Sequence, residues 1–165
     1  MAREGEGGAA AAAVSIRKYT SADLAAVLSI CRQSPEAAQW SENGFEQAAS
    51  SGQLMLVGEV GAGAGARVCG FLVARVTAGE AELLNMAVAA TDRRKGLGSK
   101  LLAGAAKEAE ALRASRMYLE VRESNEAAIS FYERHGFRKN GQRAGYYENP
   151  TENAVLMAKE LTGWN

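Results

Sequence analysis

The segment from residue 83 to residue 113 constrains the fold more than any other part of the chain. It begins with an apolar run, residues 83–88, which predicts a strand buried on both faces, as a central strand would be. A basic turn with two glycines follows at residues 93–99, and an amphipathic helical pattern then ends near Arg113. A buried strand, a tight turn and a long helix in succession predict an α/β domain in which helices cover a sheet.

Patterns elsewhere extend this arrangement to a complete domain. Alternating or apolar runs predict strands at residues 14–19, 54–60, 68–76, 80–88, 117–121, 137–143 and 154–160. Helical spacing and capping residues predict four helices, at about residues 21–31, 40–50, 99–113 and 125–135. A Gly/Ala segment at 61–65 is expected to form a hairpin tip, and residues 146–150 a polar loop.

The chain length and the distribution of glycine and alanine predict one domain. A chain of 165 residues suits a single unit, and neither a linker nor an internal repeat divides it. Residues 1–13 are rich in Gly and Ala without periodicity, which predicts a disordered tail ahead of a domain at 14–165.

Charge and rare residue types exclude several classes of function. With 19 basic and 19 acidic residues, we expect no nucleic acid as partner, and no apolar run is long enough to span a membrane. One histidine and two separated cysteines argue against a zinc site and a Ser-His-Asp triad, so no metal is expected. The cysteines suit a reducing cytoplasm, and His135, before Gly136 at a predicted helix end, is interpreted as structural.

The turn from Arg93 to Gly98 has the chemistry of a diphosphate site. Glycines allow close backbone approach, a helix start offers free N–H groups, and three cations precede it. The alternative is an ordinary turn that carries a solvated basic patch. The spacing does not fit a P-loop, and Leu101 stands where a dinucleotide fingerprint needs its third glycine.

The pattern Arg93-x-x-Gly96-x-Gly98 resembles the acetyl-CoA loop of the GNAT superfamily of N-acetyltransferases. Residues 119–137 look like its second conserved block: a strand, Asn125, a helix with Phe131-Tyr132, and then Gly-Phe. Segments 84–88, 119–125 and 146–157, with Trp40-Ser-Glu near the N-terminus, are similar to bacterial ribosomal-protein-alanine N-acetyltransferases of the RimI type. The resemblance spans roughly residues 14–161. Three features depart from it: Gln39 in place of the usual proline, the Gly/Ala hairpin at 61–66, and the N-terminal tail.

The resemblance implies a GNAT fold: a mixed, mostly antiparallel twisted sheet of about seven strands flanked by about four helices. It implies an acyltransferase that uses acetyl-CoA to acetylate the α-amine of an Ala-starting ribosomal protein, as a monomer or weak homodimer. Other acceptors remain open, namely lysines, other protein N-termini and small amines. A non-catalytic acyl-CoA-binding module is a further alternative.

By this resemblance Glu120 is the proton acceptor and Tyr132 the general acid. The pattern alone leaves open a solvated Glu120 and a Tyr132 that belongs to the core. Residues implied to bind acetyl-CoA lie on the strand, the turn and the next helix start: Met86, Ala87, Val88, Arg93, Arg94, Lys95, Gly96, Leu97, Gly98, Ser99 and Asn125. Trp40, Tyr146 and Tyr147 are candidates for the walls of a peptide groove, although Trp40 could instead plug the sheet.

Overall fold

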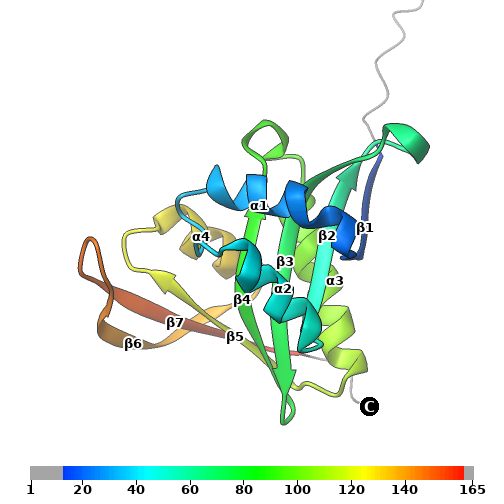
Figure 1. Ribbon diagram of the computed structural model, residues 1–165. Helices are drawn as coiled ribbons and strands as arrows, with labels where there is room; N and C mark the ends of the chain where they lie inside the picture. The colour runs from blue at the N-terminus through cyan, green and yellow to red at the C-terminus, as the bar shows by residue number, and fades with distance from the viewer. Residues whose placement is uncertain (1–12, 162–165) are drawn as a thin grey trace, which may run out of the picture.

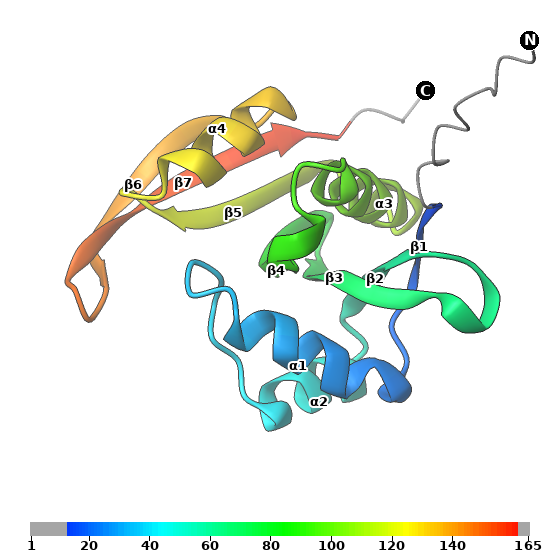
Figure 2. The same cartoon turned by 90° about the horizontal axis from the view of Figure 1, so that it is seen from above.

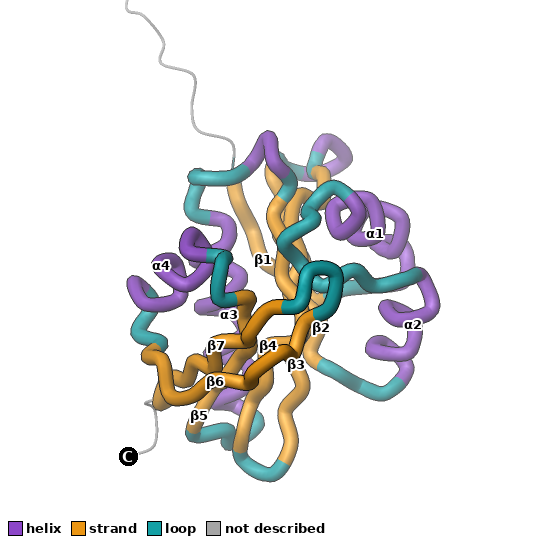
Figure 3. The backbone as a smooth tube through the Cα atoms, turned by 90° about the vertical axis from the view of Figure 1, so that its left-hand side faces the viewer, coloured by secondary structure: helices purple, strands orange, loops and turns teal. Residues whose placement is uncertain are grey.

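A computed structural model describes residues 13–161 and contains one seven-stranded sheet in the order β1-β2-β3-β4-β5-β7-β6 (Figure 1). The strands are β1 Val14–Lys18, β2 Leu54–Val60, β3 Arg67–Thr77, β4 Glu80–Val88, β5 Arg116–Arg122, β6 Arg138–Tyr147 and β7 Glu152–Glu160. The helices are α1 Leu24–Arg32, α2 Glu42–Ser50, α3 Leu97–Ala111 and α4 Glu126–Arg134. Helices α1 and α2 cover one face of the sheet, and α3 and α4 lie on the other (Figure 3). The predicted architecture is confirmed.

The sheet divides where β4 meets β5. All other neighbouring strands are antiparallel, whereas β4 and β5 run parallel and pair only from Glu80 opposite Arg116 to Glu82 opposite Tyr118. Beyond these pairs the two strands separate, and β5, β6 and β7 form an arm that diverges from the rest of the sheet (Figure 2). A bulge adds to the bend of β4, because Val73 and Ala74 face Asn85 and Leu83 and leave Leu84 without a partner on β3.

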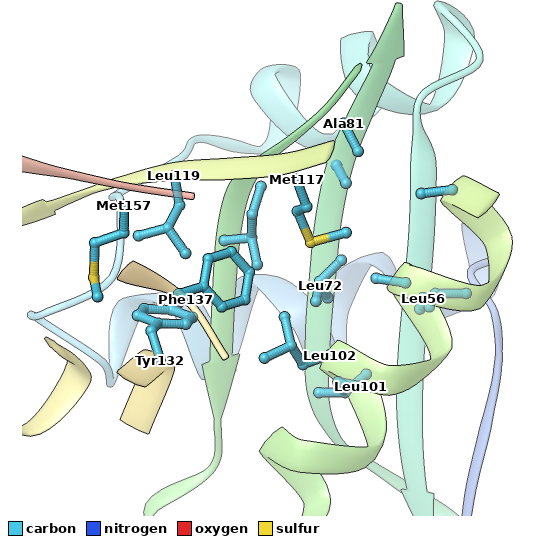
Figure 4. Close-up of a cluster of buried hydrophobic side chains, with 14 of the residues drawn as sticks. Leu56, Leu72, Ala81, Leu101, Leu102, Met117, Leu119, Tyr132, Phe137 and Met157 are labelled. Carbon is cyan, nitrogen blue, oxygen red and sulfur yellow. The ribbon is translucent and has the colours of Figure 1, made fainter. Parts of the chain in front are cut away.

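Two hydrophobic cores hold the helices to the sheet. The larger one packs α3 and α4 against the sheet, with Leu101, Met117, Leu119 and Phe137 almost fully buried (Figure 4). The start of α3 is fixed by Leu97, which is 1% exposed and lies over Gly58 and Gly70. A Cβ on Gly58 would approach Leu97 Cδ1 to 2.5 Å, so only glycine leaves room for this side chain. Removal of apolar surface from water stabilises such packing by about 25 cal/mol per Å².

Helix starts follow the capping residues that the sequence indicated. Ser41 accepts a hydrogen bond from the Gly44 amide at 3.2 Å, and Asn125 accepts one from the Ala128 amide at 3.2 Å. The first helix also begins at a predicted cap, because Thr20 is the N-cap and its amide donates to Asp23 Oδ2 at 2.8 Å. Its opening turn, Ser21–Asp23, is however a 3-10 turn, and α1 begins only at Leu24.

The C-terminal hairpin differs from the prediction. The sixth strand extends over Arg138–Tyr147, so Tyr146 and Tyr147 belong to a strand and the connecting loop is only residues 148–151. This strand is polar and almost entirely exposed, and therefore lacks the alternation that marks half-buried strands. The Gly/Ala hairpin tip between β2 and β3 is confirmed.

The predicted tail at residues 1–13 lies outside the described residues apart from Ala13. Within residues 13–161, no helix combines the length and the apolar character needed to cross a membrane.

Candidate active site

A cleft of about 1060 Å³ opens where β4 and β5 separate. Its walls come from the turn before α3, from β4 and β5, from α4, and from the end of β6. The loop between α1 and α2 closes one side through residues 35–39. Segments far apart in the sequence therefore meet at the point where the sheet divides (Figure 2).

The glycine turn forms one end of this cleft. Gly96 is the N-cap of α3 with a φ of +80°, a backbone conformation that favours glycine, and Arg94 has a φ of +63°. Gly96 has no side chain that could accept from the first amides of α3, so these N–H groups remain available to a ligand. Arg93 and Arg94 line the same end. Free amides, the positive end of a helix dipole and two guanidinium groups suit an anion such as a diphosphate.

The exposed edge of β4 supplies the middle of the cleft. Met86, Ala87 and Val88 line it beyond the last β4–β5 pair, where β5 no longer runs alongside. A strand edge that faces a cleft can pair with an extended ligand as it would with another strand. The donor site implied by the resemblance thus has a continuous surface along β4 and the turn.

Glu120 lies on the opposite wall, on the face of β5 away from the buried Leu119 and Val121. Its side chain is 17% exposed and forms an ion pair with Arg143 of β6, Nε to Oε1 2.9 Å. Hydrogen bonding with this carboxylate raises the pKa of Tyr146. Burial, with a smaller contribution from the charge of Glu120, raises the pKa of Tyr147 to about 12. A carboxylate that lines a cleft can accept a proton from a substrate bound there.

Tyr132 belongs both to the core and to the lining of the cleft. It is 8% exposed and packs edge-to-face with Phe131 and Phe137, at ring-centroid distances of 5.3 and 5.5 Å. Figure 4 shows it beside Phe137. It also lines the cleft that contains Glu120. Burial raises the pKa of Tyr132 well above the ordinary tyrosine value, so the phenol is protonated at neutral pH.

Most of the predicted residues line this one cleft, but three do not contribute as expected. Lys95 lies outside the lining and is 3.5 Å from Asp92, whereas the side chain of Leu97 points into the core and only its backbone remains for a ligand. Trp40 lines a separate, shallow pocket and packs against Phe45 at a centroid distance of 5.3 Å. The two pockets share Gln39 and Leu84, so Trp40 lies next to the cleft without lining it.

An ion pair with a buried carboxylate, which the sequence did not indicate, holds the glycine turn against the sheet. Asp92 has a fully buried side chain and forms two hydrogen bonds with Arg67 of β3, both 2.7 Å. These bonds lower the pKa of Asp92 to about 2. Because Asp92 lies four residues before Gly96, the pair fixes the approach of the chain to α3.

The loop between α1 and α2 is held by side chains, which explains how Gln39 substitutes for the expected proline. Its Nε2 donates to the carbonyls of Cys31, Ser34 and Ala37 at 3.1, 2.8 and 3.1 Å. Asn85 of β4 donates to the Ala38 carbonyl at 2.8 Å.

This loop also contacts the glycine turn. Arg93 forms an ion pair with Glu36, Nη2 to Oε1 2.7 Å. The sequence offered no signal for these contacts, because they join segments more than 45 residues apart.

Comparison with known proteins agrees with the geometry. The sequence pattern of the acetyltransferase (GNAT) family matches residues 21–137. Ribosomal protein bS18-alanine N-acetyltransferase of Escherichia coli K12 is 34% identical over 149 residues, which cover 89% of this chain and 97% of that protein. The crystal structure of the E. coli ribosomal-protein-S18-alanine N-acetyltransferase has a TM-score of 0.79 at 30% identity, and covers 93% of this chain and 97% of its own. Ard1 from Thermoplasma volcanium has a TM-score of 0.83 at 27% identity, over 92% and 99% of the two chains.

The predicted reaction class and the predicted superfamily are therefore confirmed. The chain belongs to the GNAT family of N-acetyltransferases.

Proposed function

We propose that this protein transfers an acetyl group from acetyl-CoA to the α-amine of a ribosomal protein that begins with alanine. One observation carries the proposal: Glu120 and Tyr132 line the same cleft as the anion-binding start of α3. The relative in E. coli is named for the alanine of ribosomal protein bS18, which supports this class of acceptor. A ribosomal acceptor places the reaction in the cytoplasm.

The donor end of the cleft fits acetyl-CoA. The amides of Leu97, Gly98 and Ser99, with Arg93 and Arg94, would hold the diphosphate. The edge formed by Met86, Ala87 and Val88 would pair with the pantetheine arm. Asn125 lines the cleft and also caps α4, so its side chain is already oriented by the Ala128 amide. When bound, acetyl-CoA supplies the acetyl group as a thioester that an amine can attack directly.

Each of the two proposed catalytic side chains carries out one of the two proton transfers in the reaction. Glu120 accepts the proton that the amine loses as it forms the new amide bond. Tyr132 provides a proton at Oη for the departing thiolate. Tyr146 and Tyr147 extend from the end of β6 beside Glu120 and would form the wall that holds the acceptor peptide.

An α-amine suits this site better than a lysine on grounds of basicity. At pH 7.5 roughly a third of an α-amine with a pKa near 7.8 is neutral, compared with about 0.1% of a lysine with a pKa near 10.4. Glu120 then needs to remove a proton mainly after attack, and one carboxylate is sufficient for this task.

A matched pair of peptides tests the proposal. Both begin with Ala and contain one internal lysine, and one has its α-amine blocked by a formyl group. After incubation with acetyl-CoA, mass spectrometry should find acetyl on the free α-amine and none on the blocked peptide. Acetyl on the lysine alone would make the protein a lysine acetyltransferase. Binding of acetyl-CoA without transfer to any amine would indicate a non-catalytic module.

A further inference from the structure

His135, the only histidine in the sequence, lines the cleft at the end formed by the glycine turn, where the proposed donor would bind. Its ring lies between the end of α4 and the first turn of α3. The Nδ1 atom is 2.7 Å from the Phe131 carbonyl oxygen, and Nε2 is 2.8 Å from the Ser99 hydroxyl. Ser99 lies within the turn whose amides face the proposed diphosphate site. The imidazole therefore contacts a residue of the anion site directly.

The hydrogen-bonding capacity of these two partners determines which nitrogen of the His135 ring carries a hydrogen. A carbonyl oxygen can only accept, so Nδ1 must carry a hydrogen, and in a neutral ring Nε2 is then an acceptor. The Ser99 hydroxyl must donate to Nε2 in that state, and its proton is not available to a phosphate. If the ring gains a proton, Nε2 donates to Ser99 instead, and the Ser99 hydroxyl is free to donate into the cleft.

From this geometry we infer that His135 is a positioning residue for acetyl-CoA, which takes up a proton when the diphosphate binds and acts through Ser99. The inference rests on the proposed function. A proton from solvent bonds to Nε2, the Ser99 hydroxyl rotates, and its hydrogen bond passes from the ring to a phosphate oxygen. No other bond changes, and the proton returns to solvent when the ligand leaves.

The charged groups around the ring agree with such a coupling. The turn before α3 and the first residues of α3 carry Arg93, Arg94, Lys95 and Lys100, and α4 carries Glu126, Glu133 and Arg134. Lys159 of β7 lies against the neighbouring Gly136. Arg94 and Arg134 line the same cleft as His135. No described residue forms an ion pair with the imidazole. The diphosphate would bring negative charge to the ring, and negative charge favours a protonated imidazole.

Proton counting tests the inference with a ligand that does not itself titrate. The probe is 3′-dephospho-CoA, which lacks the phosphomonoester whose second pKa is near 6. Its binding to the tag-free chain is measured by calorimetry in two buffers of different ionisation enthalpy, between pH 6.5 and 8.5. We expect uptake of roughly half a proton per ligand near neutral pH, and a three- to tenfold weaker affinity at about pH 8.5 than at about pH 6.5.

Two variants distinguish a proton-linked role of His135 in ligand binding from a purely structural role. His135→Gln should abolish the uptake and flatten the pH dependence to less than about twofold, and Ser99→Ala should reduce the uptake although the ring remains. In the unmodified chain, the ring ¹⁵N shifts of the single histidine should move from the Nδ1–H tautomer to the cationic form when the probe binds.

Binding of the probe with no proton uptake and no change in the ¹⁵N shifts would overturn the inference and leave the proposed function intact. Failure of both CoA and the probe to bind would overturn both. Equal uptake by His135→Gln and the unmodified chain would assign the proton to another group and overturn the role of His135.

Discussion

The Arg67–Asp92 pair gives a stability prediction whose size follows from the structure. The Asp92 side chain is fully buried, and its pKa is about 2, compared with 3.8 for an ordinary aspartate. A shift of about 1.8 units corresponds to roughly 2.4 kcal/mol at neutral pH. Arg67 is 55% exposed, so solvent screens its share, and Lys95 and Thr91 remain near the carboxylate. We expect Arg67→Met to lower the free energy of unfolding by about 1–2 kcal/mol at pH 7.

The pH dependence identifies the carboxylate as the cause. A depressed pKa contributes stability above the unfolded value near 3.8, and this stability is lost as the pH falls through the folded value near 2. The difference between the unmodified chain and Arg67→Met should therefore be constant from pH 7 to about pH 5, and should fall by about half at pH 3.

Urea unfolding followed by far-ultraviolet circular dichroism at pH 7, 5 and 3 measures this difference. Arg75→Met is the matched control, because Arg75 lies on the same strand and pairs with Glu82 in a more exposed position, with side chains 52% and 21% exposed. We expect this control to cost less than about 1 kcal/mol. An equal loss for Arg67→Met at pH 7 and pH 3 would refute the assignment, since the stability that comes from the depressed pKa of Asp92 should already be reduced by about half at pH 3.

Three predictions concern catalysis and donor binding. Tyr132→Phe should lower kcat by about 10²-fold or more and change the Kd of CoA by less than about twofold, because it removes the transferred proton and little volume. Glu120→Gln should lower kcat by about 10²–10⁴-fold, because the proton that the amine loses as the amide bond forms then has no carboxylate to accept it. Gly98→Glu should abolish CoA binding in calorimetry through bulk and like charge, whereas Gly98→Ala should retain most of it, since its Cβ would lie 3.4 Å from Phe131 Cζ.

Each of these has a contrary outcome. An unchanged kcat in Tyr132→Phe would return the tyrosine to a purely structural role in the core. An unchanged kcat in Glu120→Gln would mean that the carboxylate does not deprotonate the amine. Near-normal CoA affinity in Gly98→Glu would move the diphosphate site away from the start of α3.

Local signals in the sequence were sufficient for most of the elements. The apolar run at 83–88, the glycine turn and the amphipathic pattern after it predicted β4 and α3 correctly, because burial periodicity and capping act over neighbouring residues. Asn125 was placed correctly at a helix start for the same reason. The last strand pair was harder to predict, since β6 is exposed and its length depends on pairing with β7 across two irregular positions.

The candidate site is a product of tertiary structure. The sequence supplied Glu120, Tyr132 and the turn at Gly96 as candidates, but each had a plain structural alternative. These residues share one cleft because β4 and β5 stop pairing after Glu82 and Tyr118. The position at which the two strands separate depends on the packing of the whole sheet.

The sequence by itself determined the strand–turn–helix unit and the residue types able to bind a diphosphate and move a proton. Only the tertiary structure decided the partners of those residues: Arg143 beside Glu120, Arg67 against Asp92, and His135 on Ser99. The physical reason is the separation along the chain over which each kind of interaction acts. Backbone propensity and capping act within a few residues, whereas ion pairs and hydrogen bonds between segments 23 to 36 residues apart exist only after the sheet has brought those segments together.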